Sequence, residues 1–132
     1  MLGKRTLERL YQHTLESTDK GAFRNHPCTV WANETVANAR WLIKHGLALC
    51  EEYSNRYAKI HSCLHTLAYA DKLFPLDALH TSKLTPFTRA MPDEYKHDTS
   101  IDTFTAYKNY IRSKSWVASN YLRDPSRQPD WI

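Results

Sequence analysis

The stretch LALCEEYSNRYAKIHSCLH, residues 47–65, decides the fold, because polar and apolar side chains both recur in it at helical spacing. One side of the predicted helix carries side chains four, three and four residues apart: Glu52, Arg56, Lys59 and Cys63. The other side carries apolar and aromatic ones: Leu49, Tyr53, Tyr57, Ile60 and Leu64. Such a helix either lines a polar, anion-binding pocket or lies on the surface with its charges paired.

Helical spacing also extends to both flanks of this stretch. We expect a short helix over residues 6–17 and a second helix that begins near Thr29 or Asn33. Gly46 either kinks or ends this second helix, which is otherwise continuous with the 47–65 stretch. A cap at Thr99 or Ser100 begins a last helix, which runs to about residue 121. We expect the tail to pack back through Trp131.

Residues 74–98 hold three of the six prolines and sustain neither the helical nor the strand period. We expect them to form a long irregular loop, which in a small domain is usually functional or mobile. No segment alternates as a strand would. The sequence therefore predicts an all-α fold, with residues 1–132 forming a single compact domain of four or five helices.

Composition narrows the class of protein without naming an activity. A chain of 132 residues can bury a core without disulfides or metals. The net charge of +4 favours an anionic partner, but it fits a merely soluble basic protein about as well. Three widely spaced cysteines without a CxxC pair indicate reduced thiols in a cytoplasmic protein. We expect no signal peptide, no membrane span and no cofactor.

The charged side of residues 47–65 is the first candidate for chemistry. Arg56 and Lys59 would hold phosphate, since arginine offers a planar fork and lysine a point charge. Glu52 would orient or deprotonate a ligand. The alternative is that Glu52 and Arg56 form an ordinary i,i+4 surface pair, which stabilises a helix by about 0.2–0.5 kcal/mol.

Further candidates lie outside this stretch or at its end. His26 precedes a predicted helix start, where backbone N–H groups attract anions, although the same residues would also form a plain turn. The loop offers Asp93 as an acid or hydrogen-bond acceptor and Tyr95 beside it, or it is simply a connector. His61 and His65 are spaced to share a metal on a helix, but the HExxH motif is absent, and we expect ordinary histidines and no metal site.

Four segments in order carry a family resemblance: HPCTVWANETVANARWL, LCEEYSNRYAKIH, TPFTRAMPDEYK and AYKNYI followed by a late aromatic residue. Over residues 25–131 the chain resembles a group of small bacteriophage-encoded proteins. Members of that group tend to have RYGK where this chain has Ala58 in RYAK. The resemblance implies the host-cell cytoplasm as location, and nucleic acid, nucleotides or host-defence signals as partners.

Size, basicity and helical content also resemble those of the phage pyrimidine-dimer DNA glycosylases, in architecture only. That likeness implies an attack on the sugar by a free N-terminal amine. Leu2 follows Met1 here, and a bulky second residue should block removal of the methionine. We therefore expect no small nucleophilic N-terminus in this chain.

Three hypotheses of function follow from these observations. The first is a basic helical protein that binds a phosphate-bearing ligand, either a nucleotide, a nucleotide signal or a nucleic-acid end. The second is a DNA repair or processing enzyme of base-excision type, and the third is an inhibitor of a host protein. Each of these hypotheses is compatible with a homo-oligomer. In the first, the ligand-binding residues are His26, Trp31, Tyr53, Arg56, Tyr57, Lys59, His61 and Tyr95, and Glu52 and Asp93 contact the ligand or act as acid and base.

Overall fold

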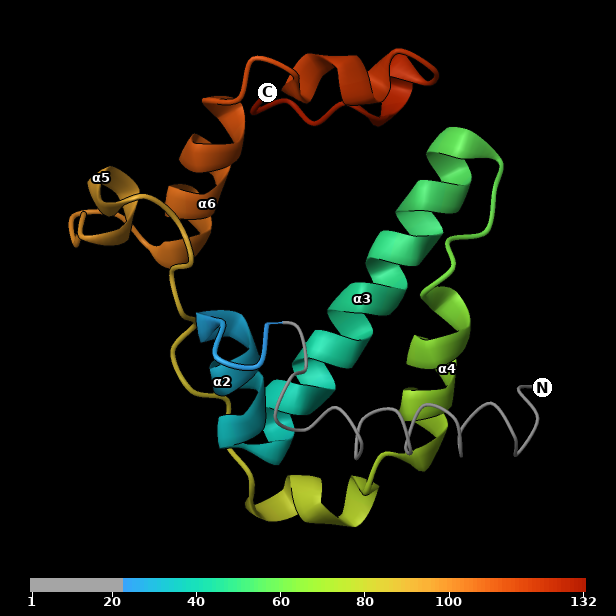
Figure 1. Cartoon of the computed structure of the whole chain (residues 1–132), viewed down its shortest axis with the longest axis vertical. Coiled ribbons are helices and arrows are strands. Elements are labelled where there is room, and N and C mark those ends of the chain that lie inside the picture. The colour runs from blue at the N-terminus through green and yellow to red at the C-terminus, as the bar shows by residue number, and fades with distance from the viewer. Residues whose placement is uncertain (1–22) are drawn as a thin grey trace.

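The computed structural model describes residues 23–132, whose regular elements are all helical and are joined by loops (Figure 1). Its α-helices are α2 (Pro27–Glu34), α3 (Val36–Tyr57), α4 (Leu64–Leu73), α5 (Asp93–Lys96) and α6 (Thr103–Arg112). Its 3₁₀ turns are η1 (Leu76–Thr81), η2 (Val117–Tyr121) and η3 (Pro125–Arg127). Residues 23–132 contain no strand, so the predicted all-α class is confirmed. The helix predicted over residues 6–17 lies outside the described residues.

Side-chain caps fix where the first two described helices begin. The ring Nδ1 of His26 accepts a hydrogen bond from the backbone N–H of Cys28 at 3.1 Å, and Pro27 fills the first helical position. The hydroxyl of Thr35 accepts from the N–H of Asn38 at 3.0 Å and starts α3. Helix therefore begins two residues before Thr29, and a single extended residue separates α2 from α3.

Gly46 neither kinks nor ends a helix, because α3 runs through it from Val36 to Tyr57. A Cβ atom at Gly46 would lie 2.9 Å from the side chain of Leu67 in α4. The missing side chain thus lets α4 pack closely against α3, along which it runs back (Figure 1). The glycine signal in the sequence came from helix packing and not from a break.

The helix predicted over residues 47–65 is interrupted at residues 58–63, because α3 ends at Tyr57 and α4 begins at Leu64. Ala58 adopts a left-handed conformation with φ 50° and ψ 37°, and its N–H donates to the carbonyl of Ser54 at 2.9 Å. This is the usual geometry of a residue just past a helix end. Lys59 and Cys63 therefore do not lie on the same helix as Glu52 and Arg56. His61 precedes α4, so it does not share a helix with His65.

The segment over residues 74–98 is irregular apart from η1 and α5, as predicted. Asn38, which has no exposed surface, fixes its path. The Asn38 Nδ2 donates to the carbonyl of Trp31 at 2.8 Å and to the Thr85 hydroxyl at 2.7 Å. The N–H of Thr85 donates in turn to the Asn38 Oδ1 at 3.0 Å. These bonds hold residues 82–88 against α2 and α3.

The last helix is shorter than predicted and begins later. Asp102 caps α6 by accepting from the N–H of Thr105 at 3.0 Å, and the helix ends at Arg112, well before residue 121. The chain continues as η2 and η3 and returns toward α6. There the Nζ of Lys108 lies 5.7 Å from the centre of the Trp131 ring, consistent with the expected return of the tail.

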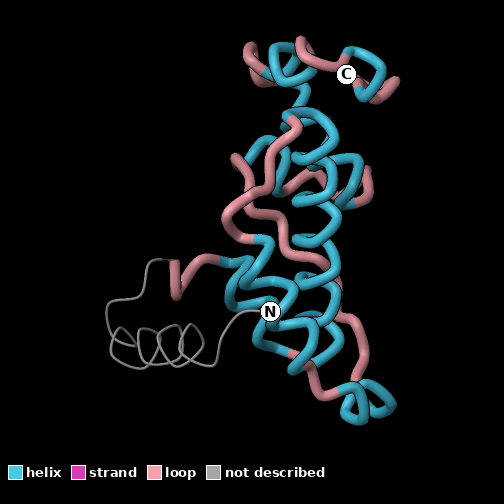
Figure 2. Tube along the Cα trace, turned by 90° about the vertical axis from the view of Figure 1, so that its right-hand side faces the viewer, coloured by secondary structure: helices cyan, strands magenta, loops and turns pink. Residues whose placement is uncertain are grey.

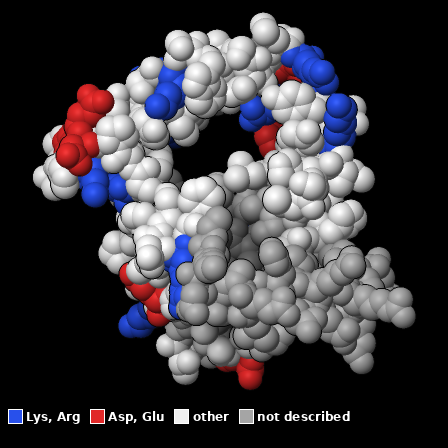
Figure 3. Space-filling view, viewed as in Figure 1, with Lys and Arg blue, Asp and Glu red and all other residues white. Residues whose placement is uncertain are grey.

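Seen together, the helices surround an opening. Figure 3 shows it in the face of the molecule, between α6, the C-terminal segment and α3. In the perpendicular view of Figure 2, the helices of residues 23–132 stack along one long axis. Among residues 23–132 the buried apolar residues are few: Trp31, Ala32, Cys50, Ala106, Val117 and Tyr121. Among the described helices, none is long and apolar enough to cross a membrane.

Candidate functional site

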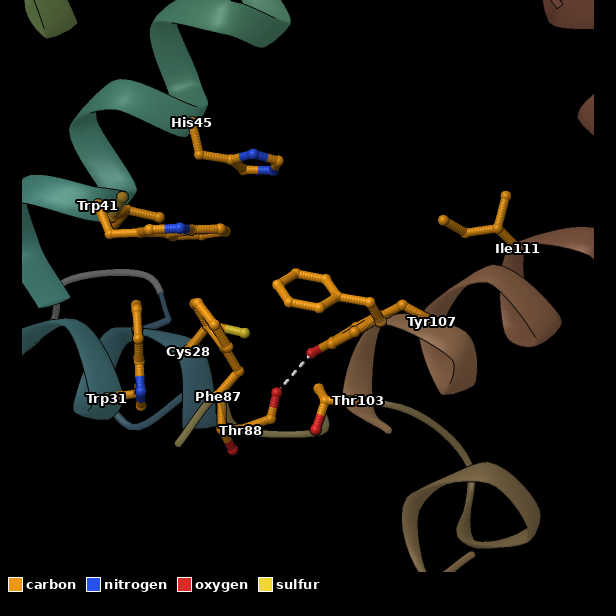
Figure 4. Close-up of a pocket in the computed structure, with 11 residues that line it drawn as sticks. Cys28, Trp31, Trp41, His45, Phe87, Thr88, Thr103, Tyr107 and Ile111 are labelled. Carbon is orange, nitrogen blue, oxygen red and sulfur yellow. Dashed lines mark hydrogen bonds between the residues drawn. The ribbon is translucent and has the colours of Figure 1, made fainter. Parts of the chain in front are cut away.

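An aromatic cavity of about 350 Å³ lies where α2, α3 and α6 approach one another (Figure 4). It is lined by Cys28, Trp31, Trp41, Leu42, His45, Phe87, Thr88, Thr103, Phe104, Tyr107 and Ile111. Pockets that hold small organic ligands start at roughly 300 Å³. The cavity is therefore large enough for a planar ring system.

Ring-on-ring packing shapes the walls of this aromatic cavity. Trp31 and Trp41 meet edge to face, with ring centres 5.8 Å apart and an interplanar angle of 89°. Phe87 lies 4.6 Å from Trp41 and 5.1 Å from Phe104, so it joins α3 to α6. His45 stacks on Trp41 at 4.7 Å and 17°, one helical turn further along α3 (Figure 4). The cavity thus offers flat apolar faces to an aromatic guest.

Tyr107 is the main polar anchor of the cavity. Its hydroxyl donates to the carbonyl of Thr88 at 2.7 Å, the bond drawn in Figure 4, and accepts from the N–H of Ala90 at 3.0 Å. Burial raises the pKa of Tyr107, and the neighbouring Cys28 thiol also raises it. The indole Nε1 of Trp31 is buried and has no hydrogen-bond partner among residues 23–132.

Two of the predicted residues meet Arg127 at the far end of α3. The Nε of Arg56 donates to the Glu52 Oε1 at 2.7 Å. Arg127 reaches both carboxylate oxygens, with its Nε 3.3 Å from Oε1 and its Nη2 paired to Oε2. The hydrogen bonds from Arg127 and then from Arg56 lower the pKa of Glu52 to about 2. We call Glu52, Arg56 and Arg127 the arginine cluster.

Residues 117–132, here called the C-terminal arm, also pack on the end of α3 through tyrosines. The guanidinium carbon of Arg56 lies 4.3 Å from the centre of the Tyr121 ring. The Tyr57 hydroxyl donates to the carbonyl of Asn120 at 3.4 Å, and Arg123 lies 5.6 Å from the Tyr57 ring. The arm thereby forms one side of the opening seen in Figure 3.

The remaining predicted residues near this end of α3 form a second aromatic group. Tyr53 lies 4.9 Å from Tyr57 and 5.0 Å, edge to face, from His61. The Nδ1 of His61 accepts from the N–H of Cys63 at 3.1 Å. Lys59 is exposed in the segment that joins α3 to α4. The structure thus brings Tyr53, Tyr57 and His61 together beside the arginine cluster.

Other predicted residues lie elsewhere. Asp93 is exposed at the start of α5, 3.4 Å from the Nε2 of His97, and Tyr95 packs on Tyr110 at 5.7 Å. In Figure 1, α5 and the end of α3 lie on opposite sides of the molecule, so Asp93 and Glu52 are not brought together. His26 caps α2 and is exposed. Within the described part, no three His, Cys, Asp or Glu residues are grouped to hold a metal.

Sequence reasoning placed Trp31 in a site but missed the residues around it. Trp41 and His45 carry a weak signal, since aromatic rings four residues apart lie on one side of a helix. Phe87 and Phe104 carry none, because only the folded chain brings them to α2 and α3. The cavity is therefore a product of tertiary structure.

Charge is unevenly distributed over the described residues. Residues 103–128 contain five lysines and arginines and a single acidic residue, Asp124. Residues 93–102 contain four acids and one lysine. Figure 3 shows these acids as a separate red projection, while blue side chains lie around the opening. Positive charge is therefore concentrated on α6 and the C-terminal arm.

Comparisons with known proteins give one match. No curated protein and no solved structure matches the chain. A family model described as pyrimidine dimer DNA glycosylase matches residues 2–65. That range contains α2 and α3, hence one wall of the aromatic cavity and two of the three residues of the arginine cluster. Over residues 2–65 the chain is therefore similar to the pyrimidine dimer DNA glycosylases.

Proposed function

We propose that the protein binds DNA as part of base-excision repair. In this proposal Arg56 and the basic residues of 103–128, including Arg127, hold the phosphate backbone. The aromatic cavity accepts a base that has left the stack. Enzymes that act on a base must extrude it from the duplex, and they hold it between aromatic and apolar side chains.

The observation that carries the proposal is that the cavity and the arginine cluster share one face of α3. Trp41, His45, Glu52 and Arg56 follow one another at intervals of four, seven and four residues along this helix. Such intervals keep side chains on one side. Eleven residues from His45 to Arg56 correspond to about 16 Å along the axis. One rigid element thus presents a base site and a phosphate site at a fixed separation.

That separation favours a polynucleotide over a single nucleotide. Phosphates of one B-DNA strand are about 3.4 Å apart along the axis, so roughly 16 Å corresponds to about five of them. A mononucleotide in the cavity would leave the arginine cluster without a phosphate. The match to a DNA glycosylase family over residues 2–65 supports DNA as the polymer.

The proposal concerns binding and assigns no chemical step to the two predicted catalytic carboxylates. Neither Glu52 nor Asp93 lines the cavity. Glu52 is held ionised by two arginines, and Asp93 lies on the acidic side of the molecule. Their role as acid and base in cleavage stays a prediction.

Duplex binding measured by fluorescence anisotropy over a salt series tests the proposal. We expect the logarithm of the affinity to fall steeply with the logarithm of salt, because phosphate contacts release counterions. Trp41→Leu should weaken binding to a duplex with a mismatched base more than binding to a fully paired duplex. Trp116→Leu is the control, since Trp116 is 57% exposed and does not line the cavity.

Three results would contradict the proposal. A salt-independent affinity, or none, would exclude backbone binding. An equal effect of the Trp41 and Trp116 substitutions on both duplexes would remove the cavity from DNA recognition. Displacement of the duplex by free mononucleotides at similar concentrations would instead favour a nucleotide ligand.

A further inference from the structure

Glu52 meets two guanidinium groups in the way that a bound phosphate would. Arg127 approaches both carboxylate oxygens, and Arg56 donates to one of them. A planar guanidinium fork fits carboxylate and phosphate oxygens equally well. The two arginines come from segments 71 residues apart, so the fold builds this anion site from α3 and the C-terminal arm.

The carboxylate is not the sole contact that holds the C-terminal arm on α3. The hydroxyl of Tyr57 bonds to the backbone of Asn120, and Arg56 lies over the ring of Tyr121. Arg123 lies beside the ring of Tyr57. These contacts use no atom of Glu52, so the arm has other attachments when the carboxylate moves away.

The two arginines remain accessible to a ligand. The side chain of Arg127 is 40% exposed and that of Arg56 is 21% exposed, while Glu52 is 24% exposed. Glu51 and Asp124 lie near enough to Arg127 to raise its pKa further. An incoming phosphate would therefore compete chiefly with Glu52, which is the only one of these three acids that bonds directly to Arg127 within the described residues.

We propose that Arg56 and Arg127 form a phosphodiester site and that Glu52 occupies it as an internal anion, which a DNA phosphate displaces on binding. This inference rests on the proposed function, because it takes the phosphate from DNA. Glu52 then limits the affinity for DNA and contributes no proton transfer. It also keeps the guanidinium groups of Arg56 and Arg127 paired while the site is empty of ligand.

Glu52→Gln tests this role, because the amide keeps the shape and loses the charge. We expect Glu52→Gln to bind a fully paired duplex roughly fivefold more tightly at low salt, the scale set by one partly exposed ion pair. Asp71→Asn is the matched control. Asp71 pairs with Arg40, another α3 arginine, and neither residue belongs to the arginine cluster or lines the cavity. Its substitution should leave the affinity unchanged.

The arginines give a second measurement that does not depend on how well Glu52→Gln folds. Replacing one phosphate-binding cation should reduce the salt slope by about one. We expect this reduction for Arg127→Gln and for Arg56→Gln, and no reduction for Arg40→Gln. In the double variant Glu52→Gln, Arg127→Gln, the gain from the first substitution should shrink.

Inorganic phosphate separates a failure of this inference from a failure of the proposed function. At constant ionic strength, millimolar phosphate should raise the melting temperature of Glu52→Gln more than that of the wild type or Asp71→Asn. That result without any duplex binding would support the anion site and overturn the DNA proposal. Duplex binding by the wild type, with equal affinity for Glu52→Gln and unchanged slopes for both arginine variants, would overturn the inference alone.

Discussion

Ala58 closes the last turn of α3 on Ser54, to whose carbonyl its N–H donates at 2.9 Å, and it does so at a φ of 50°. A left-handed conformation costs a residue with a Cβ roughly 1–2 kcal/mol relative to its usual conformations, whereas glycine adopts it freely.

Ala58→Gly should therefore stabilise the protein by about 0.5–1 kcal/mol, part of the relief being lost to the greater freedom of an unfolded glycine. Urea unfolding followed by circular dichroism measures the change. Ala48→Gly, at an exposed position inside α3, should instead destabilise by about 0.5–1 kcal/mol. A loss of stability at both positions would contradict the left-handed geometry of Ala58.

Asn38→Ala should be among the most damaging single changes. It removes the donor to the Trp31 carbonyl and the acceptor for the Thr85 N–H, and it leaves both backbone groups unpaired at a buried position. We expect a loss of about 2–4 kcal/mol in the free energy of unfolding. Glu34→Gln alters only an exposed bond to the Thr85 hydroxyl, and it should cost less than about 0.5 kcal/mol.

The stability of the folded protein at low pH should depend on the arginine cluster. The pKa of Glu52 is lowered to about 2 in the folded protein, against an ordinary value of 4.5. Its contribution is therefore fully present above pH 4.5 and is lost as the pH falls from there toward 2. Wild type should lose about 1 kcal/mol more than Glu52→Gln across this window, after allowance for solvent screening. Hydrogen bonds also lower the pKa of Asp98 and Asp102. Both residues are present in the two proteins, so their contributions to the pH dependence cancel in the comparison. Parallel pH profiles would contradict the pairing.

Tyr107→Phe should loosen the aromatic cavity without changing its volume greatly. The substitution leaves the carbonyl of Thr88 and the N–H of Ala90 without their common partner. We expect a loss of about 1–2 kcal/mol in stability and weaker binding of a mismatched duplex. Tyr110→Phe, whose ring packs on Tyr95, is a suitable control. An unchanged stability in Tyr107→Phe would show that the hydroxyl is solvated in the folded protein.

The sequence was sufficient for the helical class, because Leu49, Tyr53 and Tyr57 repeat at a spacing that only a helix satisfies. It was insufficient at Ala58 and Gly46. The helical spacing of side chains continues through Ala58, although the backbone is left-handed there and α3 ends. Gly46 leaves room for the side chain of Leu67, which belongs to another helix. Both features depend on tertiary contacts that a local pattern does not contain.

The candidate site was likewise predictable only in the part that depends on local spacing. Glu52 and Arg56 lie one turn apart on one helix, so their pairing follows from spacing alone. Arg127 joins them from 75 residues beyond Glu52, and no local signal marks it. Phe87 reaches Trp31 and Trp41, and Phe104 reaches Phe87, by the same kind of long-range approach, and for that reason the cavity was not predicted.

The 75-residue separation between Glu52 and Arg127 also has a kinetic consequence. Closing so long a loop costs entropy that is recovered only when both ends have docked. The contact should therefore form after the local pairing of α3 with α4, and it should open first under native conditions. The Tyr57–Asn120 hydrogen bond and the Arg56–Tyr121 contact still hold the C-terminal arm on α3 when this pair opens, so Arg127 can exchange one anion for another while the arm stays in place.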